Sequence, residues 1–466
     1  MAAMTRVVIV GGGPGGYESA LVAAQLGAEV VVVDSDGLGG SAVLTDCVPS
    51  KTLIATAEVM TDLSEAGELG ITVDAPRVDL ARVNQRVKAL ALAQSADIES
   101  RLAREGVRVV HGRGRLDGPS RVIATLADGA EEAYDADAVL VATGATPRVL
   151  PTAQPDGERI LTWEQVYDLT ETPEHVIVVG SGVTGAEFAS AYQSLGIPVT
   201  LVSSRDRVLP GEDQDAAQVL EDVLTRRGMT VLSRSRMQSV TRGGADGSDP
   251  DTVTVTLADG REVSGSHCIL ALGSVPNTAG IGLEAAGVAL DDGGFVTVDR
   301  VSRTSVPGVY AAGDCTGVFM LASVAAMQGR IAMAHVLGDA VQPLDLGVVA
   351  SNVFTSPEIA TVGVTQKQVD AGEVLAEVIV QPLVTNARAK MQGIVDGFVK
   401  LFVAPGSRSL LGGVVVGPRA SELIHPVALA VTERLTADQL AQTFTVYPSI
   451  SGSIAEAARR LHRTAG

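Results

Sequence analysis

The stretch GGGPGGYESALVAAQLGAEVVVVD, from Gly11 to Asp34, has a second, related copy further along this chain. The second copy, GSGVTGAEFASAYQSLGIPVTLVS, runs from Gly180 to Ser203 and aligns with the first without a gap. Each copy follows a buried β-branched strand, VVIV in the first and VIVV in the second, and reads as a glycine turn, an Ala-rich helix and a second buried strand. The repeat therefore predicts two separate βαβ units in one chain.

The glycines of both copies have the G-x-G-x-x-G spacing of a dinucleotide-binding turn. In this pattern the first glycine permits a tight turn, the second lets the backbone approach a pyrophosphate, and the third lets the helix pack on the strand. The helix N-terminus then faces the phosphates with its partial positive charge. The spacing predicts cofactor contacts for two sets of glycines: Gly11, Gly13 and Gly16 in the first copy, and Gly180, Gly182 and Gly185 in the second.

The two copies differ at their last position, Asp34 in the first and Ser203 in the second. A carboxylate there accepts hydrogen bonds from ribose hydroxyls, although a strand-end acid can also be merely solvated. A serine does not repel a 2′-phosphate, and Arg205 and Arg207 follow it, where guanidinium groups suit a phosphate. The alternative is a pair of solvated arginines bound to Asp206. We expect the second site to accept both NADPH and NADH.

Composition excludes several classes of function. A chain of 466 residues, 46% of them apolar, is expected to form two or three well-buried domains. A formal net charge of −19 argues against a nucleic-acid partner. Three cysteines are too few for a secreted disulfide framework, and no secretory signal pattern is present, so we expect a cytoplasmic protein. No apolar stretch is long enough to span a membrane, and the histidines show no metal-ligand spacing.

With these features in place, the chain resembles the pyridine nucleotide-disulfide oxidoreductases, the family of dihydrolipoamide dehydrogenase, glutathione reductase and soluble transhydrogenase. The resemblance covers nearly the whole chain and rests on several independent motifs in the family's order. Besides the two glycine turns, these are LGGSAVLTDCVPSKTL (38–53), ATGATPR (142–148), GSVPN (273–277), GVYAAGDC (308–315) and VFTSPEIATVG (353–363).

The resemblance implies an α/β fold with two Rossmann-like dinucleotide-binding domains, the second inserted in the first, and an α+β C-terminal dimerisation domain. It implies FAD in the first site, NAD(P)H in the second, and a homodimer. We place the FAD-binding domain at residues 1–146 and 273–340, the NAD(P)-binding domain at 147–272, and the dimerisation domain at 350–466.

The family also implies roles for individual residues. Asp314 is expected to bind the ribityl chain of FAD, and Lys51 to provide a fixed cation beside the flavin, with Glu187 as its partner near the nicotinamide. Further cofactor contacts are expected from Ser41, Gly114, Thr143, Gly144 and Gly273.

The chain departs from the disulfide reductases of this family at their reactive groups. Their redox cysteine pair corresponds here to Ala42 and Cys47, so a dithiol cannot form. Their C-terminal HPTxxE pattern is also missing, because the chain reads YPSISG from Tyr447. Cys47 therefore has two readings: a thiol that faces the flavin and can be oxidised, or a small buried side chain.

Without a disulfide, a reduced flavin must pass its electrons to an acceptor that reaches it directly. A flat, apolar, two-electron acceptor such as a quinone meets this requirement, which favours an NAD(P)H:quinone oxidoreductase. Two alternatives stay open: a soluble NAD(P) transhydrogenase, and a catalytically quiet flavoprotein with Cys47 as a redox sensor.

Overall fold

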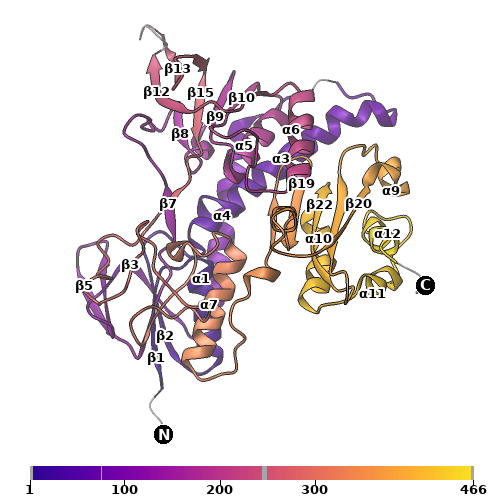
Figure 1. The fold of residues 1–466 in the computed structure, drawn as a ribbon. Helices are drawn as coiled ribbons and strands as arrows, with labels where there is room; N and C mark the ends of the chain where they lie inside the picture. The colour runs from indigo at the N-terminus through magenta and orange to yellow at the C-terminus, as the bar shows by residue number, and fades with distance from the viewer. Residues whose placement is uncertain (1–3, 75, 244–248, 463–466) are drawn as a thin grey trace. The chain divides into compact units, whose positions relative to one another are not determined.

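The computed structural model describes residues 4–74, 76–243 and 249–462, which form two compact units (Figure 1). The first unit comprises Met1–Thr52, Asn84–Arg148 and Gly273–Asp345. The second comprises Leu53–Val83, Val149–Leu272 and Leu346–Gly466. Two helices, α3 (Cys47–Glu65) and α4 (Leu80–Arg104), have residues in both units.

The first unit is built on a seven-stranded sheet with the order β17-β6-β1-β2-β3-β4-β5. Its strands are β1 (Arg6–Val10), β2 (Glu29–Asp34), β3 (Arg108–Leu116), β4 (Arg121–Leu126), β5 (Glu131–Asp135), β6 (Ala138–Val141) and β17 (Val309–Ala311). The strands from β17 to β3 pair in parallel, whereas β3, β4 and β5 pair in antiparallel. Strands β1 and β6 are buried throughout or nearly so, as expected for a parallel sheet covered on both faces.

Helices α1 (Pro14–Gln25) and α7 (Ala322–Val336) of this unit lie side by side (Figure 1). They approach closely because Gly329 leaves room for the backbone of Gly15 and the hydroxyl of Ser19. The remaining elements of the unit are α2 (Gly40–Leu44), the 3₁₀ turn η3 (Asp314–Thr316), and a ribbon of β7 (Ala145–Pro147) and β16 (Ser274–Pro276). This ribbon joins the two chain segments that border residues 149–272.

The second unit contains a parallel five-stranded sheet with the order β11-β10-β9-β15-β8. Its strands are β8 (Ile160–Thr162), β9 (Val176–Val179), β10 (Val199–Val202), β11 (Thr230–Leu232) and β15 (His267–Leu270). Helix α5 (Val183–Ser194) connects β9 to β10, and α6 (Gln214–Arg226) connects β10 to β11. A three-stranded antiparallel sheet follows, formed by β12 (Met237–Gly243), β13 (Asp249–Leu257) and β14 (Glu262–Gly265).

The last part of the second unit is an antiparallel sheet with the order β18-β19-β22-β21-β20. Its strands are β18 (Ala350–Val353), β19 (Glu358–Gly363), β20 (Glu377–Pro382), β21 (Phe398–Val403) and β22 (Leu410–Gly417). The helices of this part are α8 (Gln366–Asp370), α9 (Ala387–Met391), α10 (Ala420–Thr432), α11 (Ala437–Gln442) and α12 (Gly452–Arg460). Elsewhere and here, the second unit also contains the short 3₁₀ turns η1 (Ala66–Leu69), η2 (Val166–Asp168), η4 (Leu346–Val348) and η5 (Leu383–Thr385).

The predicted fold is confirmed: each copy of the sequence repeat forms a βαβ unit, and an α+β region follows. Across the part of the chain that the structure describes, no helix combines the length and hydropathy needed to cross a membrane.

Candidate nucleotide-binding sites

The first glycine turn joins β1 to α1, and the protein itself requires a glycine at two of its three glycine positions. Gly11 has a positive φ of +103°, and a Cβ there would overlap the carbonyl of Ala142. A Cβ on Gly16 would overlap the carbonyl of Gly11. A Cβ on Gly13 would find no atom nearer than Cα of Gly40, 4.0 Å away.

The second glycine turn, between β9 and α5, shows the same pattern: its first and third glycines are closely packed, and its middle glycine is not. Gly180 has a φ of +114° and lies against the carbonyl of Ala271, and Gly185 lies against the carbonyl of Gly180. A Cβ on Gly182 would meet nothing within 4 Å. Gly182 and Gly13 have φ angles of −72° and −67°, which any residue can adopt.

The middle glycine of each turn is thus required neither by the backbone conformation nor by packing within the protein. Both leave open space at a helix N-terminus, where the helix dipole favours an anion. A pyrophosphate that approaches the backbone would fill this space, so both turns fit a dinucleotide.

Asp34 is buried at the end of β2, with 9% of its surface exposed. Its Oδ2 accepts a hydrogen bond from the backbone N–H of Gly12 at 2.6 Å, and its Oδ1 accepts from Asp36 and Gly37 at 3.0 and 2.7 Å. Asp34 is therefore not a solvated strand-end acid, because it holds the glycine turn in place. Its role toward a ribose stays a prediction.

Ser203 makes the corresponding contact in the second copy. Its side chain is fully buried, and its Oγ lies 2.6 Å from Oγ of Ser181, the residue that aligns with Gly12. The same Oγ accepts a hydrogen bond from the backbone N–H of Arg205 at 3.1 Å. Ser203 thus ties the strand end to the glycine turn without adding a negative charge.

Asp314 begins η3 in the first unit and is half-buried. Burial, and then the negative charge of Asp46, raise the pKa of its carboxyl group to about 6. Among the described residues, no protein group donates a hydrogen bond to this carboxylate. A half-buried acid without a protein donor fits a ligand that brings hydroxyl groups of its own.

The loop after β6 carries Thr143 and Gly144. The carbonyl of Thr143 accepts a hydrogen bond from Nδ2 of Asn277, and the carbonyl of Gly144 accepts from the backbone N–H of Asn277, both at 3.0 Å. A Cβ on Gly144, whose φ is +70°, would meet nothing within 4 Å, so its open side can accept a cofactor.

Three other predicted contact residues lie in a packed strand, in a left-handed backbone position and in a short helix. Gly114 lies in β3 with no room for a Cβ between the side chains of Val10 and Val33, so packing alone accounts for this glycine. Gly273 has a φ of +84°, and its carbonyl accepts from the N–H of Arg148 at 2.8 Å. Ser41 lies in α2 and is half-buried. Contact with a cofactor stays a prediction for all three.

Lys51 and Cys47 lie in the first two turns of α3, and both side chains are half-buried. Cys47 is the first residue of this helix, a position where the helix dipole favours a thiolate. The other two cysteines are buried: burial raises the pKa of the Cys268 thiol and raises that of Cys315 to about 11. Of the three cysteines, Cys47 is thus the one that is partly exposed, and Ala42, which stands at the position of the family's second redox cysteine, lies in α2.

Glu187 lies in α5 with 4% of its surface exposed. Its Oε1 accepts a hydrogen bond from the backbone N–H of Phe354 at 2.8 Å. One turn further along the helix, Oγ of Ser190 accepts from the N–H of Ser356 at 3.0 Å. The segment VFTSPE thus fixes the helix that follows the second glycine turn, a contact that sequence analysis did not predict.

Sequence analysis also did not predict that Ser233 and Arg234, which follow β11, lie beside the turn after β10. The sheet order places β11 beside β10, so the turn after each strand reaches the same edge of the sheet. The stretch TVLSRSR, a short apolar strand followed by arginines, could have given this signal in combination with the strand order of a βαβ fold.

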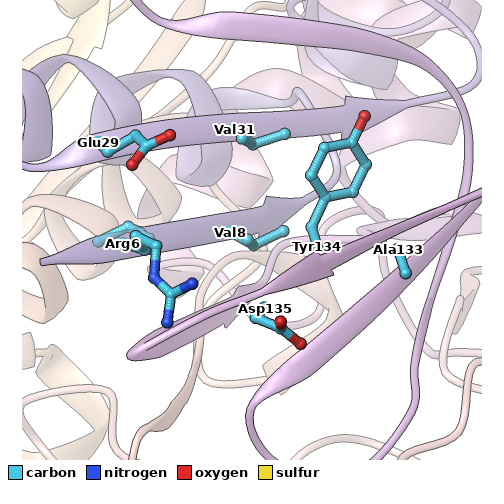
Figure 2. Close-up of a pocket in the computed structure, with 8 residues that line it drawn as sticks. Arg6, Val8, Glu29, Val31, Ala133, Tyr134 and Asp135 are labelled. Carbon is cyan, nitrogen blue, oxygen red and sulfur yellow. The ribbon is translucent and has the colours of Figure 1, made fainter.

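A separate cavity of about 270 Å³ opens between β1, β2 and β5 of the first unit. Figure 2 shows Arg6, Val8, Glu29, Val31, Ala133, Tyr134 and Asp135 around it. Arg6 and Glu29 are the first residues of their strands, so this cavity lies at the opposite end of β1 and β2 from the glycine turn. None of the predicted site residues lines it.

These two dinucleotide turns, in this fold, define a flavoprotein oxidoreductase that uses FAD and NAD(P)H. The chain belongs to the pyridine nucleotide-disulphide oxidoreductase family, whose model matches residues 5–329. The model of the family's dimerisation domain matches residues 349–458.

Several relatives are known. An NAD(P)H dehydrogenase (quinone) of Mycobacterium tuberculosis is 57% identical, over 98% of this chain and 94% of the relative. A dihydrolipoyl dehydrogenase of Zymomonas mobilis is 33% identical, over 97% and 96% of the two chains. The crystal structure of LpdA from Mycobacterium tuberculosis superposes with a TM-score of 0.94 at 56% identity, and covers 99% of this chain and 100% of LpdA.

Proposed function

We propose that this chain is an FAD-dependent NAD(P)H:quinone oxidoreductase. The observation that carries the proposal is the state of the cysteines: both dinucleotide turns are intact, yet Ala42 replaces the partner that Cys47 would need to form a redox disulfide. The relative from Mycobacterium tuberculosis is named a quinone dehydrogenase, which agrees with an acceptor other than a disulfide.

When bound, FAD would supply the redox chemistry, the transfer of two electrons between NAD(P)H and an acceptor. The chain's own residues bind and orient the reactants. The turn at Gly13 would admit the pyrophosphate of FAD, and the carboxylate of Asp314 would accept hydrogen bonds from cofactor hydroxyls. Lys51 provides a positive charge that favours the anionic reduced cofactor.

The second site holds NAD(P)H by the same principles. Gly182 admits the pyrophosphate of the nucleotide, and Glu187 keeps the start of α5 fixed through its hydrogen bond to Phe354. A fixed nucleotide matters because a hydride donor must be held in reaction geometry.

The dimerisation domain supports a homodimer. Exposed apolar side chains in that region are natural candidates for the interface, because a monomer rarely leaves such groups in water. The most exposed are Leu375, Phe444, Val446 and Tyr447, each with at least 79% of its surface exposed.

An anaerobic titration of the flavin-loaded protein tests the proposal. Flavin bleaching should be complete at about one NADPH or NADH per FAD, because FAD holds two electrons and no dithiol takes two more. Steady-state oxidation of NADPH should then proceed with a soluble benzoquinone and not with lipoamide. Reduction of a thionicotinamide nucleotide in place of the quinone would instead indicate a transhydrogenase.

A further inference from the structure

Two consecutive residues of helix α7 contact both parts of the first unit that are predicted to bind FAD. Helices α7 and α1 lie side by side (Figure 1), and Gly329 leaves room there for the backbone of Gly15 and the hydroxyl of Ser19. The preceding residue, Gln328, forms hydrogen bonds with the turn η3, which begins at Asp314. One turn of α7 thus joins the helix that follows the first glycine turn to the turn that carries Asp314.

The side chain of Gln328 is buried, with 1% of its surface exposed. Its Oε1 accepts a hydrogen bond from the backbone N–H of Gly313 at 2.8 Å, and its Nε2 donates to the hydroxyl of Thr316 at 3.4 Å. Thr316 in turn donates its hydroxyl to the carbonyl of Gly313 at 2.7 Å. Gln328 therefore contacts both ends of the turn from Gly313 to Thr316, and Asp314 lies between them.

The backbone of this turn determines where the carboxylate of Asp314 points, because no protein group among the described residues donates a hydrogen bond to that carboxylate. Gly313 lies beyond Ala311, the last residue of β17, and its buried N–H is accepted by the side chain of Gln328. Burial of an amide side chain is unfavourable unless its hydrogen bonds are made. Gln328 meets this requirement at the turn itself, so its amide group has a specific use there.

We infer that Gln328 is a positioning residue for FAD, which holds the turn so that the carboxylate of Asp314 meets hydroxyl groups of the cofactor. The inference rests on the proposed function, in which FAD lies along the first glycine turn and Asp314. Gln328 acts through Asp314, whereas Gly329 keeps α1 close to the same helix. The separation between the glycine turn and Asp314 is thus set from one place in α7.

Gln328→Met removes the hydrogen bonds and keeps a side chain of similar length. The buried N–H of Gly313 then lacks its acceptor, a loss that typically changes an equilibrium constant about 10- to 100-fold. In the FAD-free protein the turn is expected to move until this N–H reaches water, and binding of FAD must reverse that movement. The dissociation constant of FAD should therefore rise by about the same 10- to 100-fold.

The test measures FAD release from the flavin-loaded protein by the rise of flavin fluorescence over a dilution series. A double-mutant cycle with Asp314→Asn separates positioning from a general loss of stability. If Gln328 acts through Asp314, then adding Gln328→Met to Asp314→Asn should change the dissociation constant by no more than about twofold. Unchanged FAD release in Gln328→Met, or fully additive effects in the cycle, would overturn the inference.

Gln381→Met is the matched control. Gln381 lies in β20 of the second unit, is 8% exposed, and donates its Nε2 to the hydroxyl of Thr385 at 2.7 Å. The control removes the same kind of buried hydrogen bond, so it should lower resistance to chemical unfolding and leave FAD release unchanged. An equal rise of the FAD dissociation constant in Gln328→Met and Gln381→Met would show that lost stability alone releases the cofactor.

Two further measurements separate the possible failures. If Gln328→Met does not fold, Thr316→Val removes the hydroxyl that closes the same turn with a side chain of equal size; it should release FAD more readily than wild type, and unchanged release would count against the inference. If Gln328→Met loses FAD but the flavin-loaded wild-type protein reduces no quinone, the proposed acceptor fails and the inference stands. If the wild-type protein reduces quinones and Gln328→Met holds FAD equally tightly, only the inference fails.

Discussion

Lys400 donates its ammonium group to both carboxylate oxygens of Asp213, at 2.9 and 2.8 Å, and the two side chains are 1% and 3% exposed. Lys400 lies in β21, whereas Asp213 caps the N-terminus of α6 by accepting from the N–H groups of Asp215 and Ala216. Because α6 connects β10 to β11, this buried ion pair links the dimerisation region to the sheet that carries the second glycine turn, within one unit.

Loss of this lysine should strongly destabilise the protein. Lys400→Met leaves the Asp213 carboxylate buried without its counterion, which typically costs about 3 to 5 kcal/mol. Chemical unfolding of the FAD-loaded protein measures the effect. Lys367→Met, the same change at an exposed position of α8, should stay within about 0.5 kcal/mol of wild type. A small, equal loss in both variants would show that the buried pair adds nothing to stability.

The sequence predicted both glycine turns because their signal is local. The spacing of Gly11, Gly13 and Gly16 specifies a turn. The contacts that require its glycines come from the turn itself or from the end of the neighbouring strand in the sheet. The same holds for Gly180, Gly182 and Gly185, so the repeat was sufficient to place both glycine turns in the fold.

Contacts between distant residues could not be predicted in this way. The hydrogen bond from Phe354 to Glu187 and the ion pair from Lys400 to Asp213 each join positions more than 160 residues apart. Neither a helical nor a strand periodicity relates such positions. The backbone hydrogen bond from the N–H of Arg234 to the carbonyl of Arg205 depends on the strand order and on a left-handed residue, which spacing does not reveal.

Asp314 should make the stability of the FAD-free protein depend on pH. Its folded pKa of about 6 lies above the ordinary value of 3.8, so the folded state keeps a proton that the unfolded state releases. The stability that this proton provides is present below about pH 4 and is lost as the pH rises through 6, a change of about 2 to 3 kcal/mol at most. Asp314→Asn should thus be more stable than wild type at pH 7.5 and no more stable at pH 4. A pH-independent difference between the two proteins would contradict this assignment.

Replacement of each middle glycine should separate the two sites. Gly13→Ala adds a methyl group that the protein can accommodate but that occupies the approach of the FAD pyrophosphate, so the purified protein should lose its yellow colour. Gly182→Ala should keep FAD and lose NADPH-dependent bleaching. Each variant is the control for the other, and circular dichroism should show that both are folded. Full flavin content in Gly13→Ala would mean that no cofactor needs that space.

Cys47→Ser should leave quinone reduction within about twofold of the wild-type rate, because a quinone takes electrons without a sulfur relay. The variant keeps a small polar side chain at the start of α3, so the fold should be unaffected. Turnover with NADPH and a soluble benzoquinone measures the effect. Abolished turnover with normal flavin content would instead favour a thiol-based sensor or peroxidase.

Lys51→Ala should slow anaerobic reduction of the flavin by NADPH about 10²-fold or more, because the developing negative charge loses its proposed counterion. Stopped-flow bleaching at saturating NADPH measures this rate apart from quinone turnover. Lys51→Arg keeps the positive charge and should recover most of the rate, whereas Lys367→Ala removes a lysine elsewhere and should change nothing. A normal rate in Lys51→Ala would remove this lysine from the redox site and leave the reduced flavin without its proposed cation.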